Sequence, residues 1–85
     1  MPLYKILISE TAAKQINKLP HPVRNILLTS IESLATNPRP AGYKKLTGRN
    51  GYRIRKDDYR IIYEVHDGVL YIKIIAVGHR KDVYE

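Results

Sequence analysis

The chain has 85 residues, with 15 Lys or Arg against 8 Asp or Glu, which gives a formal net charge of +7. This length fits one domain, so we expect residues 1–85 to form a single unit without a separate cofactor domain. A pI near 9.8 indicates a polyanionic partner, namely nucleic acid, an acidic protein or a membrane surface. The absence of cysteine excludes disulfides, thiol nucleophiles and thiolate metal sites, and it agrees with a cytoplasmic location.

The segment from Leu3 to Ile8 is apolar nearly throughout, which predicts a strand whose two faces are both at least partly covered. Lys5 interrupts the segment, which is too short for a signal peptide or a membrane span. Nothing later in the sequence reaches about 18 consecutive apolar residues. We therefore expect a soluble protein that acts without a membrane.

Two helices follow this strand in the predicted order of elements. Ser9 is a suitable N-cap, and apolar residues recur at helical spacing until Pro20: Ala12, Ala13, Ile16 and Leu19. Pro22 suits the first turn of the second helix, whose stripe ends before Asn37-Pro38: Val23, Ile26, Leu27, Ser30, Ile31 and Leu34. The two patterns predict a helical hairpin.

Residues 37–51 are rich in Pro, Gly and basic side chains, which predicts a long loop with at most a short strand around Lys45-Leu46. Side chains then alternate with period two in three segments: Tyr52 to Arg55, Tyr59 to His66 and Val69 to Val77, separated by turns at 56–58 and 67–68. The elements predict an α+β fold of order β-αα-βββ. Its N-terminal helical hairpin packs on one face of a mostly antiparallel four-stranded sheet.

Strand alternation separates apolar from cationic side chains in this predicted sheet. Tyr52 and Ile54 fall on one face, whereas Arg53, Arg55 and Arg60 fall on the other. The residues from 39 to 60 hold 8 of the 15 basic residues and only 2 of the 8 acidic ones. We therefore expect positive charge on the face that the helices leave uncovered, beside a loop with further cations: Arg39, Lys44, Lys45 and Arg49.

A polar outer face is also what any helix-backed sheet requires, so charge alone does not establish a site. Arginine at all three strand positions favours two-pronged phosphate binding, because guanidinium donors match phosphate oxygens. A guanidinium has a pKa above about 12 and does not act as a general base near neutral pH. These residues are therefore suited to hold a phosphate rather than to carry protons.

The C-terminal segment 78–85 adds the imidazole of His79, the guanidinium of Arg80 and the phenol of Tyr84. Strict alternation directs Arg80 toward the helices, but Gly78 can break the alternation through a bulge or a turn, so this direction stays open. His79 is the best acid–base candidate, because an unperturbed imidazole has a pKa of about 6.5, although a histidine at a strand end is more often structural. A solvated, frayed end is the alternative for the whole segment.

Several short motifs spread over the whole chain are similar to those of one family. They are Gly51–Arg55, Asp58–Tyr63, Val77–Arg80 and Val83-Tyr84, with Leu19-Pro20, Asn37–Pro40 and Lys45–Gly48 in the same order and spacing. On these motifs the chain resembles the RelE/ParE superfamily of bacterial toxins, which belong to toxin-antitoxin pairs. The RelE branch cleaves mRNA in the ribosomal A site, whereas the ParE branch poisons DNA gyrase and lacks the nuclease residues.

The resemblance implies the RelE-like mRNA interferase branch, because every place of the nuclease set is filled. These places fall on Arg53, Arg55, Arg60, Arg80 and Tyr84. The implied reaction is metal-independent attack of a ribose 2'-hydroxyl on the adjacent phosphate, which leaves a 2',3'-cyclic phosphate and a 5'-hydroxyl and inhibits translation. The best-known members carry lysines at the two second-strand places, one of them implicated in proton transfer, so arginine there leaves the proton carrier open.

Within that reaction, Arg60 and Arg80 are expected to grip the scissile phosphate, while Arg53 and Arg55 neutralise neighbouring phosphates or the leaving oxygen. Tyr84 is expected to stack on a base or to assist proton transfer. The loop offers candidate RNA contacts, although solvated loop cations are as common: Lys44, Lys45 and Arg49.

The resemblance also implies partners: a small, partly acidic cognate antitoxin, the ribosome with its mRNA, and operator DNA reached through the antitoxin. The rival functions are a ParE-like inhibitor of DNA gyrase and a catalytically silent antitoxin partner that serves only in repression. We expect no cofactor and no metal, because the three histidines lack ligand-like spacing. Asp57 and Asp58 are expected to be structural, because aspartate is favoured in turns. The strand tyrosines are expected to pack in the core: Tyr52, Tyr59 and Tyr63.

Overall fold

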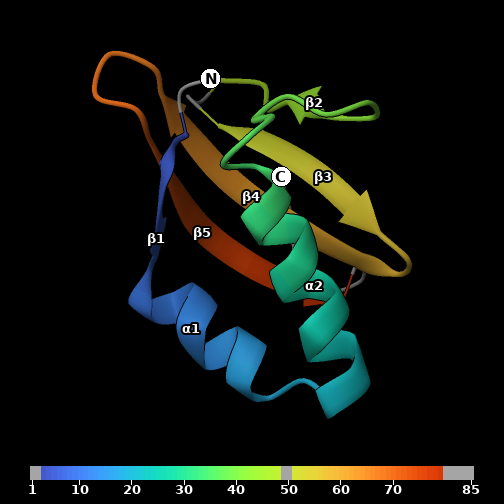
Figure 1. Ribbon diagram of the computed structural model, residues 1–85. Coiled ribbons are helices and arrows are strands. Elements are labelled where there is room, and N and C mark those ends of the chain that lie inside the picture. Colours follow the sequence, from blue (N-terminus) through green and yellow to red (C-terminus); the bar gives the residue numbers. More distant parts are fainter. Residues whose placement is uncertain (1–2, 49–50, 80–85) are drawn as a thin grey trace.

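The computed structural model describes residues 3–48 and 51–79, which form two helices and five strands (Figure 1). The elements in chain order are β1 (Lys5–Ile8), α1 (Glu10–Asn17), α2 (His21–Ser33), β2 (Lys44–Lys45), β3 (Tyr52–Lys56), β4 (Tyr59–His66) and β5 (Tyr71–His79). Both helices lie on the same side of one sheet, as the sequence predicted. The α+β class and the β-αα-βββ order are confirmed, with β2 as an addition.

The sheet has five strands in the order β1-β5-β4-β3-β2, so the expected four-stranded sheet was wrong. The additional strand is β2, one residue earlier than the short strand that the sequence allowed around Lys45-Leu46. In it Lys44 pairs with Arg53 and Lys45 with Tyr52. A strand of two residues is too short to show a period in the sequence. The sheet is also mixed, because β1 runs parallel to β5 while the other neighbours are antiparallel.

Strand β1 lies at an edge of the sheet and pairs with β5. Leu7 and Ile8 remain 39% and 42% exposed, so the cover expected for both faces of this strand is only partial. An apolar run predicts burial only when elements pack on both sides, and β1 has the helices on one side alone. Ile6 packs against the core, whereas the neighbouring Lys5 is exposed.

Local signals in the sequence set both helices. Ser9 is the N-cap of α1, because its side-chain oxygen accepts a hydrogen bond of 3.0 Å from the backbone N–H of Ala12. In α2, Pro22 lies in the first turn, where a missing N–H costs nothing. The core between helices and sheet contains these buried residues: Ala12, Ile16, Leu27, Ile31, Leu34, Ile54, Ile61, Tyr63, Val65, Ile72, Ile74 and Val77. Ile26, expected in the apolar stripe of α2, is 40% exposed.

A bulge in β5 changes which residues face the helices. Tyr63 pairs with Ile74 but Ile62 pairs with Ala76, so Ile75 is an extra residue. The bulge shifts the alternation, and Val77 therefore belongs to the helix-side core. The break in alternation that the sequence allowed at Gly78 thus lies at Ile75, three residues earlier, while Arg80 itself is outside the described residues.

The β4–β5 turn comprises the four residues Asp67–Leu70, so the fourth predicted strand begins at Tyr71 instead of Val69 and extends to His79. Leu70 has φ 55° and is 40% exposed, so it belongs to the turn and not to the buried strand. Val69 and Leu70 are apolar and continue the strand pattern, so the sequence could not reveal the longer turn.

Candidate functional site: an arginine cluster on the open face of the sheet

The face of the sheet opposite the helices brings three arginines of neighbouring strands together. Arg55 of β3 lies directly across from Arg60 of β4, and Arg53 is the next residue of β3 on the same face. The intervening residue, Ile54, packs into the helix-side core. Strand alternation thus correctly predicted a shared open face for the three guanidinium side chains, which we call the arginine cluster.

Burial differs among the three arginines. Arg53 is only 6% exposed, Arg60 is half-buried and Arg55 is exposed. Burial lowers the pKa of Arg53, and the positive charges of Arg55 and Arg60 lower it further. Three like charges this close repel one another, and an anion between them offsets the repulsion.

An apolar patch borders the cluster, which the sequence analysis did not foresee. Leu46 and Ile62 are each 3% exposed and pack with Ile75 and Ala76. The loop is folded onto the sheet, because the N–H of Leu46 donates a 2.9 Å hydrogen bond to the carbonyl of Gly51. A side chain at Gly51 would bring its Cβ within 3.3 Å of Leu46 Cδ1, so glycine permits this close approach.

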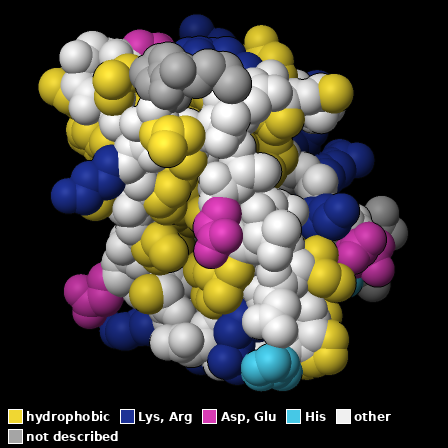
Figure 2. Space-filling view, viewed as in Figure 1, with side chains coloured by type: hydrophobic (Ala, Val, Ile, Leu, Met, Phe, Trp, Pro, Cys, Tyr) yellow, Lys and Arg dark blue, Asp and Glu magenta, His cyan; other side chains and the backbone are white. Residues whose placement is uncertain are grey.

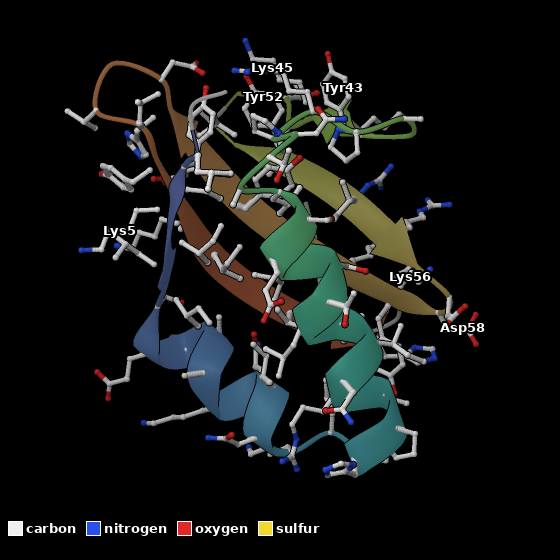
Figure 3. All side chains as sticks on the ribbon, in the orientation of Figure 1. Lys5, Tyr43, Lys45, Tyr52, Lys56 and Asp58 are labelled. Carbon is white, nitrogen blue, oxygen red and sulfur yellow. The ribbon has the colours of Figure 1, made fainter. Side chains whose placement is uncertain are left out.

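The two expected loop lysines lie on different faces. Lys44 pairs with Arg53 and therefore shares the face of the arginine cluster, whereas Lys45 pairs with Tyr52 on the helix side. Figure 3 shows Lys45 beside Tyr52 and Tyr43, at the β2 end of the sheet. Both lysines are exposed. Of this pair, the structure brings only Lys44 together with the arginine cluster.

Arg39, counted with the loop cations, belongs to a structural network instead. Its guanidinium lies 3.0 Å from Asp67 Oδ2, donates to Tyr52 Oη at 3.1 Å and covers the Tyr52 ring at 5.0 Å. Tyr4 Oη donates to the same carboxylate at 2.7 Å. These hydrogen bonds, that of Arg39 first, hold the pKa of Asp67 below its usual value. The network fixes the loop after α2 to the β4–β5 turn.

His79 lies on the helix side and not with the arginine cluster. Its ring meets Tyr59 edge-on, with ring centres 5.5 Å apart. The two residues line a cavity of about 330 Å³ together with Gln15 and Leu19 of the helical hairpin. The remaining expected site residues, Arg49, Arg80 and Tyr84, lie outside the described residues.

The described residues contain no group of three His, Cys, Asp or Glu side chains that could hold a metal ion. Asp57 and Asp58 form the two-residue turn between β3 and β4, where Asp57 has φ 56°. Neither helix in this part of the chain is long and apolar enough to cross a membrane. One aromatic pair on the open face escaped the sequence analysis: His66 and Tyr71 stack with ring centres 4.2 Å apart.

The opposite side of the molecule carries its charges differently. Figure 2 shows the helix side, where apolar side chains gather toward the middle and Lys and Arg side chains lie mostly near the outline. This view contrasts with the arginine cluster, in which the cations lie within the sheet face itself.

Comparison with known proteins places this chain in a family. Residues 6–84 match the family model described as ParE toxin of the type II toxin-antitoxin system, parDE. The chain belongs to the ParE/RelE toxin superfamily. Among named relatives of this superfamily, Toxin RelE3 of Methanocaldococcus jannaschii is 32% identical over 87 residues, covering 95% of this chain and 96% of the relative.

Solved structures of the ParE/RelE superfamily agree with this assignment. The toxin-antitoxin complex RelBE2 from Mycobacterium tuberculosis contains a chain similar to this one, with 25% identity, a TM-score of 0.85, and coverage of 96% of this chain and 97% of that one. The intact RelBE complex of Escherichia coli contains another, at 31% identity and a TM-score of 0.77, with coverage of 89% and 95%. The superfamily that the sequence motifs indicated is thereby confirmed.

Proposed function

We propose that this toxin is an endoribonuclease of the RelE branch, which cuts mRNA in the ribosomal A site without a metal. The observation that carries the proposal is the arginine cluster on the open face of the sheet. A face that concentrates three guanidinium groups, one of them almost fully buried, is suited to a phosphate backbone. The relatives named above are RelE toxins, which supports this branch.

The proposed step is attack of a ribose 2'-hydroxyl oxygen on the adjacent phosphorus. The bond from phosphorus to the 5'-oxygen of the next nucleotide breaks, and the products are a 2',3'-cyclic phosphate and a 5'-hydroxyl. Arg60 holds the scissile phosphate, and its donors stabilise the charge that builds on the phosphate oxygens. Arg53 and Arg55 neutralise neighbouring phosphates or the leaving oxygen, and Lys44 extends the positive face beside Arg53.

The C-terminal segment completes the proposed site. Gly78 lies across from Arg60 on the open face, so β5 ends beside the arginine cluster. We assign Arg80 to the scissile phosphate and Tyr84 to base stacking or proton transfer. His79 packs against Tyr59 on the other side of the sheet, so we assign it a structural role, which leaves Tyr84 as the candidate for proton transfer.

A cognate antitoxin is the proposed protein partner. Relatives from M. tuberculosis and E. coli were crystallised as toxin-antitoxin complexes. The formal charge of +7 favours an antitoxin with an acidic segment. We further propose that the pair binds operator DNA through the antitoxin and acts in the cytoplasm.

A gyrase inhibitor is the second candidate, because the matching family model describes ParE toxins. Translating ribosomes and a gyrase supercoiling assay separate the two functions. We expect cuts at defined codon positions in ribosome-bound mRNA and unchanged supercoiling. Uncut mRNA together with inhibited supercoiling would assign the chain to the ParE branch.

A further inference from the structure

The sheet face that carries the arginine cluster continues beyond it along β4 and β5. On this face His66 lies opposite Tyr71, and Tyr71 is also the partner of Lys5 in β1. Lys73 is the next residue of β5 on the same face. The surface extends from Arg60 to His66, a path of about 20 Å along β4.

The aromatic pair on this face is already stacked. The rings of His66 and Tyr71 are 4.2 Å apart with an interplanar angle of 12°. Glu64 fixes the imidazole, because its Oε1 lies 2.9 Å from His66 Nε2. Both rings are half-buried, so part of each remains accessible. A preformed stack offers a flat surface to a third ring at little further cost in conformational entropy.

Two exposed lysines flank the aromatic pair. Lys5 lies beside Tyr71 in the sheet, and Figure 3 shows its side chain pointing outward, away from the helices. Lys73 is exposed as well and lies opposite Glu64 in the register. Aromatic rings for the bases and cations for the backbone are the combination by which proteins bind single-stranded nucleic acid. Sheet faces serve this purpose in RNA-binding modules.

The path from the arginine cluster to this pair is lined on β5 by small or apolar residues. Gly78 lies opposite Arg60, Ala76 follows on the same face, and Ile75 is partly buried against the apolar patch. A strand of RNA laid along β5 therefore meets backbone, a methyl group and the Ile75 side chain before it reaches Lys73. None of these three residues carries a negative charge that would repel the RNA backbone.

Building on the proposed nuclease function, we propose that His66 and Tyr71, with Lys5 and Lys73, form a second RNA subsite. One base of the bound mRNA, several nucleotides from the scissile phosphate, stacks on the aromatic pair. The two lysines neutralise the phosphates beside that base. A purely structural cross-strand pair stabilises β4 and β5 without regard to RNA length, so length dependence distinguishes the two roles.

RNA affinity measured by fluorescence anisotropy tests the subsite. A 2'-deoxy nucleotide at the scissile position blocks cleavage, and two lengths are compared: a short RNA that covers the arginine cluster, and one that extends about 20 Å further. We expect Tyr71→Leu to weaken binding of the longer RNA about tenfold, the magnitude of one base–aromatic stack, and to leave the short RNA unchanged. Tyr71→Phe should retain affinity, because it keeps the ring.

The matched control is Tyr43→Leu, which removes an exposed tyrosine that packs beside Tyr52 on the other face. It should leave both affinities unchanged. On programmed ribosomes Tyr71→Leu should raise the half-saturating toxin concentration without lowering the maximum cleavage rate. This split indicates binding remote from the reacting phosphate.

The subsite would be overturned if Tyr71→Leu left the affinity for the longer RNA unchanged, or if it weakened binding of both RNA lengths equally. It would also be overturned if Tyr71→Leu weakened only antitoxin binding, which would assign the patch to a protein partner. Failure of the nuclease proposal is recognised separately. It requires wild-type protein that leaves ribosome-bound mRNA intact, whatever the Tyr71 variants show.

Discussion

Arg55 and Arg60 face each other across one rung of the β3–β4 ladder. Like charges in this position destabilise a sheet. The positive charges of both residues also act on buried Arg53 and lower its pKa. Repulsion of this kind costs the fold stability, whereas a polyanion-binding site uses the concentrated positive charge. At the residue scale, the arrangement is the strongest structural argument for an RNA phosphate at this place.

Replacing Arg55 by glutamine should therefore separate stability from activity. We expect Arg55→Gln to raise the free energy of unfolding by about 0.2–1 kcal/mol, because the repulsion across the rung is relieved. Cleavage of ribosome-bound mRNA should fall at the same time. Urea unfolding and a cleavage assay measure the two effects, with Lys18→Gln at the C-cap of α1 as the control for charge loss. A less stable and fully active Arg55→Gln protein would contradict the proposed role.

The Asp67 carboxylate makes the stability of the fold depend on pH in the acid range. Arg39 and Tyr4 hold its pKa below the ordinary value, so the carboxylate stabilises the fold above about pH 3.9. That contribution is lost as the pH falls through the lowered pKa of the folded protein. We expect Asp67→Asn to lower the thermal midpoint at pH 7 and to match the wild type once the pH is below the lowered pKa of Asp67. Asp58→Asn in the β3–β4 turn is the control, and a difference constant with pH would refute the linkage.

The sequence was sufficient to predict the shared face of Arg53, Arg55 and Arg60, because alternation within a strand is a local property. It was insufficient for Arg39 and His79. Arg39 contacts Asp67, far away in the chain, and charge counting cannot reveal that ion pair. The place of His79 depends on the bulge at Ile75, which leaves no mark in an apolar run.

At the scale of elements, α1 replaces β1 as the neighbour of β5. Strand β1 ends at Ile8, opposite Ile74. Beyond that point Ser9 Oγ donates to the carbonyl of Ile75 at 2.9 Å, and the N–H of Val77 donates to Gln15 Oε1 at 2.6 Å. The helix therefore satisfies the backbone groups of the bulged strand, which would otherwise lack partners.

Removing this support should weaken the fold measurably. Gln15→Leu keeps the size of the side chain but leaves the partly buried N–H of Val77 without its acceptor, which should cost about 1–3 kcal/mol. Thr11→Ala, at an exposed position of the same helix, is the control. The free energies of unfolding in urea provide the comparison. Equal stability of the two variants would show that the hydrogen bond does not support the bulge.

The helices and the three longer strands were predictable because caps, prolines and periodicity are local signals. The two edges of the sheet were not. Strand β2 is defined only by its pairing with Tyr52 and Arg53, and the apolar sequence of β1 indicates more burial than an edge provides. Pairing and edge position are properties of the assembled sheet.

At the scale of the whole molecule, the charge of +7 predicts RNA binding that weakens with salt. The logarithm of the affinity for uncleavable RNA should fall linearly with the logarithm of the salt concentration. Arg60→Ala should reduce the slope by about 0.7, the value for one phosphate contact to a single strand. Lys14→Ala on α1 should leave the slope unchanged. Equal slopes for all three proteins would argue against a phosphate contact at Arg60.

The central claim is that the arginine cluster cuts mRNA on the ribosome. Primer extension on programmed ribosomes tests it most directly, with wild-type protein, Arg60→Ala, and Lys14→Ala as the control. We predict cuts within the A-site codon for the wild type and for Lys14→Ala, and their loss for Arg60→Ala with its fold intact by circular dichroism. The same cuts from Arg60→Ala, or uncut mRNA with the wild type, would contradict the account.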